Sequence, residues 1–221
     1  MSFAKVARSC VNILFPEQCI ACGTLPAAYP LPVCSRCSDS VIRAAAPALG
    51  SSKNLTKILS CRYYEGAIKK CVKQFKYSGK LKLMDLFQPV VHTFINRTHP
   101  FSEQIHGAIP VPVHPSKRRA RGYNQSELIA TILSQEISVP VQRHTLIKTK
   151  NTGPQTALAR NKRMRNLDGS FAVVDRTLVT GRNLVLVDDI VTTGATLETC
   201  ARELLKAGAR CVYGFTLAKT P

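Results

Sequence analysis

The second half of the chain alternates between two hydrophobic patterns. Short, continuous apolar runs typical of buried strands occupy residues 107–113, 170–175, 183–189 and 210–218. Between them, residues 124–137 and 196–209 place apolar side chains every three or four positions, the spacing of an amphipathic helix. Asn124 is a suitable N-cap for the first of these helices, with Glu127 three residues later. The alternation predicts an α/β domain with a mostly parallel sheet flanked by helices.

The stretch before this domain core also predicts regular elements. Residues 56–65 are β-prone, and residues 66–80 repeat apolar side chains at helical spacing, namely Ile68, Val72 and Phe75. Residues 81–97 predict a further helix. Pro89 lies in its middle, and because proline lacks the N–H that an interior turn needs, we expect the helix to be interrupted or bent there.

The positive charge of the chain indicates which class of ligand it binds. The formal net charge is +18 over 221 residues. Residues 50–82 hold nine Lys or Arg against Glu65 alone, and residues 115–165 hold eleven against two glutamates. Such an excess favours a polyanionic partner, a diphosphate ligand, a nucleic acid or both, with a solvated basic face as the alternative. The chain has no apolar run of about 18 residues and no signal-peptide pattern, so we expect a cytoplasmic protein without a transmembrane segment.

The segment VLVDDIVTTGATL joins a buried strand to an acidic pair and a threonine-rich loop. Asp188 and Asp189 can accept hydrogen bonds from two neighbouring ribose hydroxyls or reach Mg²⁺ through water. The residues that follow offer hydroxyls and backbone N–H groups at the start of a helix, a site suited to a phosphate monoester: Thr192, Thr193, Gly194, Ala195 and Thr196. A strand-turn-helix with a threonine cap and solvated aspartates is the alternative interpretation.

A basic segment follows the strand at 107–113. It contains Lys117, Arg118, Arg119 and Arg121 between a His-Pro pair and Gly122. We expect a mobile basic loop in which Arg118 and Arg121 neutralise the charge of a pyrophosphate leaving C1 of a ribose. A solvated loop is the alternative. A third stretch adds Arg143, Lys148, Lys150, Gln155, Leu158, Arg160, Arg163 and Asn166. Its basic residues are expected on a loop and a short helix beside the same pocket.

The first 48 residues form a separate compositional unit. They contain two Cys-x-x-Cys pairs eleven residues apart, Cys19, Cys22, Cys34 and Cys37, and show little periodicity. Four thiolates at this spacing can close a tetrahedral, structural Zn²⁺ site, with redox pairs or accidental spacing as alternatives. A linker-like, Ala-rich stretch follows. We expect a zinc-finger-like module with four cysteine ligands over residues 1–48 and an α/β domain over 49–221. The other cysteines, Cys10, Cys61, Cys71, Cys200 and Cys211, lack ligand spacing, and buried thiols are expected.

These motifs together resemble a known family. The double Cys-x-x-Cys, RGYNQSE, the Gln155–Leu158–Arg163–Asn166 pattern and DDIVTTGATL occur in the order typical of the ComF family. That family includes the ComFC late-competence proteins and the GntX-type DNA-utilisation proteins, and the resemblance covers nearly the whole chain. The VLVDDIVTTGATL segment is similar to the PRPP-binding motif of type I phosphoribosyltransferases.

The resemblance implies more than the residues alone. It implies a type I phosphoribosyltransferase fold preceded by a small zinc-binding module. By this resemblance Asp188 and Asp189 hold the ribose hydroxyls of PRPP with Mg²⁺, and Thr192–Thr196 hold its 5′-phosphate. It also implies a role in DNA uptake, natural transformation or use of external DNA, with competence-machinery proteins as possible partners.

Three functions fit these features. The first is a phosphoribosyltransferase that acts on PRPP; it lacks an obvious general base, but this reaction depends mainly on charge stabilisation. The second is a non-catalytic module that binds single-stranded DNA through the basic blocks. The third is a PRPP sensor that controls an interaction through the cysteine module. The acceptor substrate is not encoded in any motif.

Overall fold

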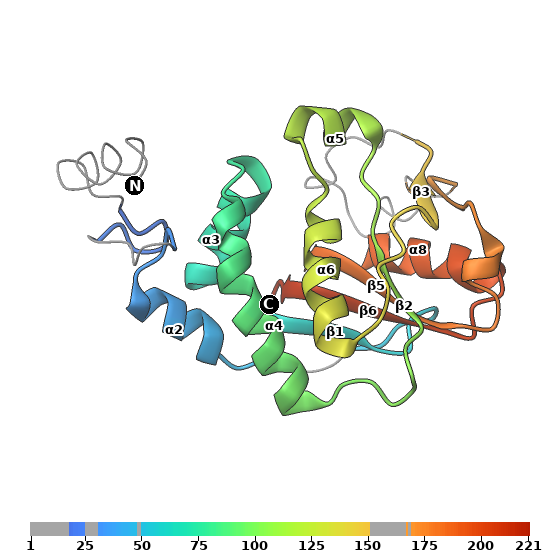
Figure 1. Cartoon of the computed structure of the whole chain (residues 1–221), viewed down its shortest axis with the longest axis horizontal. Coiled ribbons are helices and arrows are strands. Elements are labelled where there is room, and N and C mark those ends of the chain that lie inside the picture. Colours follow the sequence, from blue (N-terminus) through green and yellow to red (C-terminus); the bar gives the residue numbers. More distant parts are fainter. Residues whose placement is uncertain (1–17, 25–30, 48–49, 151–166, 168) are drawn as a thin grey trace, which may run out of the picture.

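A four-stranded sheet lies at the centre of the molecule (Figure 1). The computed structural model describes residues 18–24, 31–47, 50–150, 167 and 169–221. The strands are β1 (Ile58–Tyr63), β2 (Gly107–Pro110), β5 (Asn183–Val191) and β6 (Cys211–Lys219), in the order β1-β6-β5-β2. All three neighbouring pairs are parallel, which confirms the parallel sheet expected from the alternating pattern.

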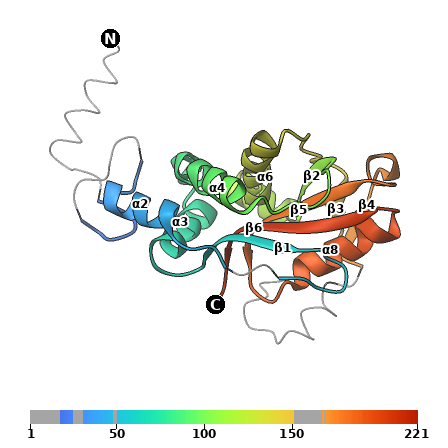
Figure 2. The same ribbon diagram turned by 90° about the horizontal axis from the view of Figure 1, so that it is seen from below.

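Helices cover both faces of this sheet (Figure 2). Helices α4 (Met84–Thr98) and α6 (Gln125–Ile137) pack on one face, and α8 (Ala195–Lys206) packs on the other. The other described helices are α2 (Ser35–Arg43), α3 (Gly66–Tyr77) and α5 (Pro115–Arg121), with short 3-10 turns η1 (Leu81–Leu83) and η3 (Arg176–Leu178). Side chains alternate along β5, so Val185 and Val187 pack in the core that contains α4 and α6. Leu184 and Leu186 pack in the opposite core with α8. No helix in the described part of the chain is long and apolar enough to cross a bilayer.

The strand expected over residues 170–175 does not belong to the central sheet. Residues 170–175 contribute only β4 (Phe171–Val173), which pairs antiparallel with β3 (Leu146–Lys148) in a separate two-stranded sheet. Phe171 is buried, but Val174 is 61% exposed, so the run is not covered on both faces. The apolar composition alone could not distinguish a central strand from half of a short hairpin.

The helix expected over residues 81–97 is not interrupted at Pro89. A 3-10 turn forms its first three residues, and α4 then runs from Met84 through Pro89 to Thr98. Pro89 lies on a helix whose buried side chains, Leu86, Phe87, Val90, Val91 and Phe94, all pack in the core. This packing stabilises the helix despite the missing backbone donor.

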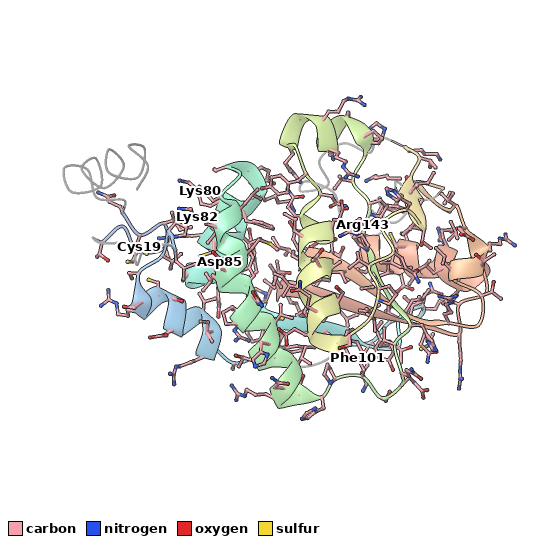
Figure 3. The ribbon with its side chains drawn as sticks, in the orientation of Figure 1. Cys19, Lys80, Lys82, Asp85, Phe101 and Arg143 are labelled. Atoms are coloured by element: carbon pink, nitrogen blue, oxygen red, sulfur yellow. The ribbon has the colours of Figure 1, made fainter. Side chains whose placement is uncertain are left out.

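The N-terminal segment packs against α3 and α4. Cys19 lies in this segment, beside α3 (Figure 3), and belongs to the same apolar cluster as Phe75. The buried guanidinium of Arg62 on β1 donates to the carbonyls of Val41 and Ile42 at the end of α2. These carbonyls lack partners within the helix, so Arg62 satisfies the C-terminus of α2 and joins it to the sheet. The domain boundary at residues 48 and 49 stays a prediction.

Candidate functional site

The acidic pair lies at the end of β5, with its two side chains on different faces. Asp188 follows Leu184 and Leu186 toward the α8 side, and Asp189 follows Val185 and Val187. One carboxylate oxygen of Asp188 accepts from the Ser126 hydroxyl at 2.8 Å and from the Asp189 backbone N–H at 2.9 Å. The expected pair is therefore divided into two groups with different partners.

Lys76 is the partner of Asp189, and sequence reasoning did not single it out. Its ammonium lies 2.7 Å from Oδ2 and 3.1 Å from Oδ1 of a carboxylate that is almost fully buried. Burial alone would lower the pKa of Lys76, but the carboxylates of Asp189 and Asp188 outweigh it and raise that pKa above its usual value. In the sequence, Lys76 is one of nine Lys or Arg within residues 50–82, and nothing there distinguishes it from the other eight.

Asp188 is electrostatically unusual. Burial raises the pKa of its carboxyl to about 6, and the adjacent Asp189 carboxylate adds to the rise. The Lys76 ammonium and the Ser126 hydroxyl act in the opposite direction. A buried carboxylate whose ionised form is disfavoured gains from a cation or from hydroxyl donors brought by a ligand.

The threonine-rich loop lies where the sequence predicts it. Asp188 and the residues from Ile190 to Leu197 line one hollow, which includes all five candidates from Thr192 to Thr196. Gly194 precedes α8 with φ of 76°, a left-handed conformation that costs other residues free energy. Thr193 Oγ1 accepts from the Ala195 N–H at 3.4 Å. The helix start, the hydroxyls and Asp188 therefore share one small site.

The basic segment forms a helix, so the loop expected there is wrong. Pro115 occupies the first turn of α5, where its missing N–H costs nothing, and the His114 ring accepts from the Ser116 N–H. Gly122 ends the helix with φ of 84°. The helix places Arg118 and Arg121 in the linings of two different hollows.

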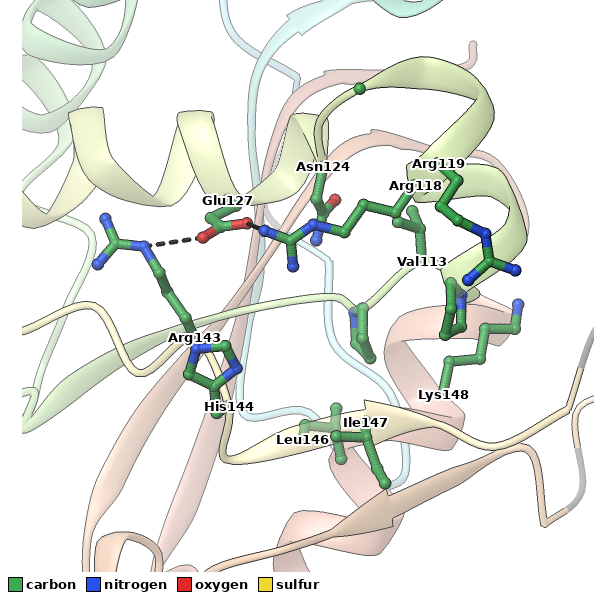
Figure 4. A pocket seen from close by; sticks show the side chains of 13 residues that line it. Val113, Arg118, Arg119, Asn124, Glu127, Arg143, His144, Leu146, Ile147 and Lys148 are labelled. Carbon is green, nitrogen blue, oxygen red and sulfur yellow. Dashed lines mark ion pairs between the residues drawn. The ribbon is translucent and has the colours of Figure 1, made fainter.

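The large basic hollow lies between α5, the start of α6 and β3 (Figure 4). Its volume is about 520 Å³, and its cations are Arg118, Arg119, Arg143 and Lys148. Glu127, the one acid in its lining, lies 3.4 Å from Arg118 and 2.8 Å from Arg143. Glu127 therefore holds two arginines, and the N-cap contact is made by Asn124 Oδ1, which accepts from the Ser126 N–H.

The small basic hollow lies between the end of α3 and α5. Its volume is about 320 Å³, and its lining consists of Lys76, Tyr77, Gly79, Lys117, Ala120 and Arg121. Lys76 joins this hollow to the acidic pair through its ion pair with Asp189. The two hollows have no lining residue in common.

The third basic stretch lies only partly within the described residues. Arg143 and Lys148 line the large basic hollow, and Lys148 is on strand β3, not on the loop or helix expected for it. Burial lowers the pKa of Lys148, and the nearby Lys117 lowers it further. Gln155, Leu158, Arg160, Arg163 and Asn166 lie outside the described residues.

The four cysteines of the two Cys-x-x-Cys pairs converge. The sulfur atoms of Cys19, Cys22, Cys34 and Cys37 all lie within 4.8 Å of one another. The Sγ atoms of Cys22 and Cys34 are 3.8 Å apart, close to the edge of about 3.8 Å in a tetrahedron with Zn–S bonds of about 2.3 Å. The cluster could hold a metal ion, and a soft thiolate set suits Zn²⁺.

The remaining cysteines give no second cluster among the described residues. Cys61, Cys71 and Cys200 are buried, as expected, and Cys211 is partly exposed. Burial raises the pKa of each of the three buried thiols. They therefore stay protonated and act as core side chains. Cys10 lies outside the described residues.

Comparison with known proteins found one matching domain and several similar proteins. Residues 124–221 match the phosphoribosyl transferase domain. The DNA utilization protein YhgH of Escherichia coli (strain K12) is 28% identical over 91% of this chain and 84% of its own length. Competence protein F of Haemophilus influenzae is 25% identical over 94% and 93%, respectively. Competence protein ComFC of Bacillus subtilis is 28% identical over 71% and 62%.

Proposed function

We propose that this chain, a homologue of the competence protein F and DNA utilization proteins with a phosphoribosyl transferase domain over residues 124–221, binds PRPP or a related ribose 5-phosphate together with Mg²⁺. The observation that carries the proposal is the hollow shared by Asp188 and Thr192–Thr196 at the N-terminus of α8. It joins an acceptor for sugar hydroxyls to an anion site within one strand-loop-helix unit.

The phosphate end is assigned to the loop. The first N–H groups of α8 have no partners within the helix, and the helix dipole places partial positive charge there. Gly194 in its left-handed conformation lets those N–H groups face the hollow without a side chain in the way. Thr192, Thr193 and Thr196 supply hydroxyls beside them. We assign the 5′-phosphate of the ligand to these donors.

The sugar and the metal are assigned to Asp188. Of the two carboxylates, Asp189 forms an ion pair with Lys76, whereas Asp188 accepts from the Ser126 hydroxyl and lines the hollow. Oxygen ligands and a raised carboxyl pKa both fit Mg²⁺, which keeps several waters and binds through one or two carboxylates. Mg²⁺ would supply neutralisation of the diphosphate charge when bound. In this assignment Asp189 does not contact the ligand. Its ion pair with Lys76 holds the end of β5, and with it Asp188, in place.

Turnover is a separate proposal from binding. Arg118 and Arg121 were both expected to stabilise a pyrophosphate leaving group, but they line different hollows. We keep Arg118 as the candidate residue for that role. Release of pyrophosphate from PRPP with an acceptor would make the protein an enzyme. Tight PRPP binding without release over a broad acceptor panel would make it a sensor. We place either activity in the cytoplasm, because free cysteines persist in a reducing compartment.

The test compares Asp188→Asn with the charge-matched control Glu103→Gln, since Glu103 is exposed and lies outside the site. Calorimetry with PRPP and Mg²⁺ should show binding by the wild type and the control. The Asn variant should bind at least about tenfold more weakly, because an amide cannot hold Mg²⁺ as a carboxylate does. Wild-type protein that binds neither PRPP nor ribose 5-phosphate, or an Asn variant that binds as the wild type does, overturns the proposal.

A second candidate function is binding of single-stranded DNA at the large basic hollow. Four cations face one carboxylate there, and the exposed Ile147 adds an apolar surface. Such a surface supports backbone contacts whose affinity falls steeply with salt. Arg143→Gln should reduce both the DNA affinity and the slope of its salt dependence. Asp188→Asn with Asp189→Asn should leave DNA binding intact if the sites are separate, and joint loss of both ligands would mean one shared pocket.

The two ligands suggest a role in use of external DNA, as the names of the homologues indicate. The four-cysteine cluster would hold a structural Zn²⁺ and present the N-terminal segment to competence-machinery proteins. Loss of DNA uptake in a strain carrying Asp188→Asn at normal protein levels would connect the ribose-phosphate site to that role.

A further inference from the structure

The small basic hollow has the dimensions of a ligand site. Its volume of about 320 Å³ falls at the lower end of the range for small-molecule pockets, roughly 300–1,000 Å³. One wall is the end of α3 and the other is α5, so two rigid helices form it. Gly79 at its edge has φ of 62° and open space where a side chain would be.

The small basic hollow lies beside the site that we propose for the ribose. Lys76 lines the hollow and contacts Asp189, the residue next to Asp188. Gln125 holds both walls together, because its side chain donates to the Lys76 carbonyl at 3.2 Å and accepts from Arg121 at 2.7 Å. A ribose bound at Asp188 would therefore lie next to this hollow, because Lys76 contacts both the hollow and the end of β5.

The chemistry of the hollow selects for a planar anion. Three cations, Lys76, Lys117 and Arg121, line it, and no carboxylate does. Lys76 is already ion-paired with Asp189, which is not part of the lining. The Arg121 guanidinium donates at 2.7 Å to a neutral amide, which does not compensate its positive charge. That guanidinium also lies 5.5 Å from the ring centre of Tyr77, and Tyr77 is 72% exposed. Flat surfaces of this kind stack on aromatic ligands.

We propose that the small basic hollow is the acceptor pocket, and that it takes a planar heteroaromatic carboxylate whose ring nitrogen has a free lone pair and no proton. The inference rests on the proposed binding of PRPP at Asp188. The cations hold the carboxylate, the Tyr77 ring stacks on the acceptor, and the ring nitrogen faces C1 of the ribose.

The bonds and charges balance without a base. The nitrogen lone pair forms the N–C1 bond, the C1–O bond to pyrophosphate breaks, and its electron pair leaves on pyrophosphate. The product ring becomes cationic at nitrogen, where its own carboxylate compensates the charge. No proton moves, which agrees with a lining that offers neither a carboxylate nor an imidazole as proton acceptor.

The test uses nicotinate and quinolinate as acidic probes and nicotinamide as the neutral match, with the full chain, Mg²⁺ and PRPP. Binding is measured by calorimetry and turnover by pyrophosphate release. Both acids should bind and release pyrophosphate, whereas nicotinamide should do so at least about tenfold less well. Arg121→Gln should weaken binding of the acids on the order of tenfold or more, the loss expected for a charge-assisted hydrogen bond. Tyr77→Leu should weaken it as well, and Lys73→Gln, an exposed α3 lysine outside the hollow, should not.

The outcomes separate this inference from the proposed function. PRPP binding with no preference for the acids over nicotinamide, or equal binding by Arg121→Gln, Tyr77→Leu and the wild type, overturns the acceptor pocket and leaves the ribose-phosphate site standing. Failure of PRPP itself to bind overturns both. Acid binding that requires PRPP and is lost in both variants supports the inference.

Discussion

Replacement of Lys76 by methionine leaves the carboxylate of Asp189 buried without its partner. The side chain of Asp189 is 6% exposed and that of Lys76 is 26% exposed, so the pair is shielded on the carboxylate side and reaches water on the ammonium side. Breaking a buried pair by removing one member costs about 3–5 kcal/mol. Because water can reach part of this site, we expect Lys76→Met to lower the free energy of unfolding by about 2–4 kcal/mol at pH 7.

Urea unfolding of Lys76→Met, Asp189→Asn and the double variant measures this coupling. The double variant should recover at least half of the loss, because it removes both charges together. A change below about 0.5 kcal/mol, or additive single effects, would refute the reasoning.

Three further predictions concern the site and the cysteine cluster. The pKa of Asp188 is raised to about 6 in the folded state, above its unfolded value, so its ionisation destabilises the fold as the pH rises toward and beyond 6. Asp188→Asn should therefore raise the free energy of unfolding by about 1–3 kcal/mol at pH 7 while weakening PRPP binding, and the gain should vanish near pH 4; a constant gain would contradict the pKa. Gly194→Ala should cost about 1–2 kcal/mol from backbone strain alone, since the nearest atoms to an added Cβ lie 3.9 Å away. Cys22→Ser should abolish bound zinc by elemental analysis and lower the melting temperature; unchanged metal content would argue against the cluster.

The local sequence pattern was sufficient to predict the parallel sheet and the cysteine cluster. The parallel sheet followed from the alternation of apolar runs and helical spacing, since these periods reflect which faces are buried. The cysteine cluster was predicted from its spacing, because each Cys-x-x-Cys pair brings two sulfurs together within one tight turn. Local pattern failed for residues 170–175 and for α5, where a short apolar run and a row of arginines each fit more than one structure.

The sequence by itself determined that the threonine-rich loop and Asp188 lie together, because these residues are close neighbours along the chain and one strand-loop-helix unit holds them in place. Only the tertiary structure decided which lysine neutralises Asp189, since Lys76 lies 113 positions away and reaches it from another helix. It also decided that Ser126 donates to Asp188 and that Arg118 and Arg121 belong to different hollows. Such contacts depend on how helices pack on the sheet, and the periodicity of a single segment does not contain the position of its neighbours.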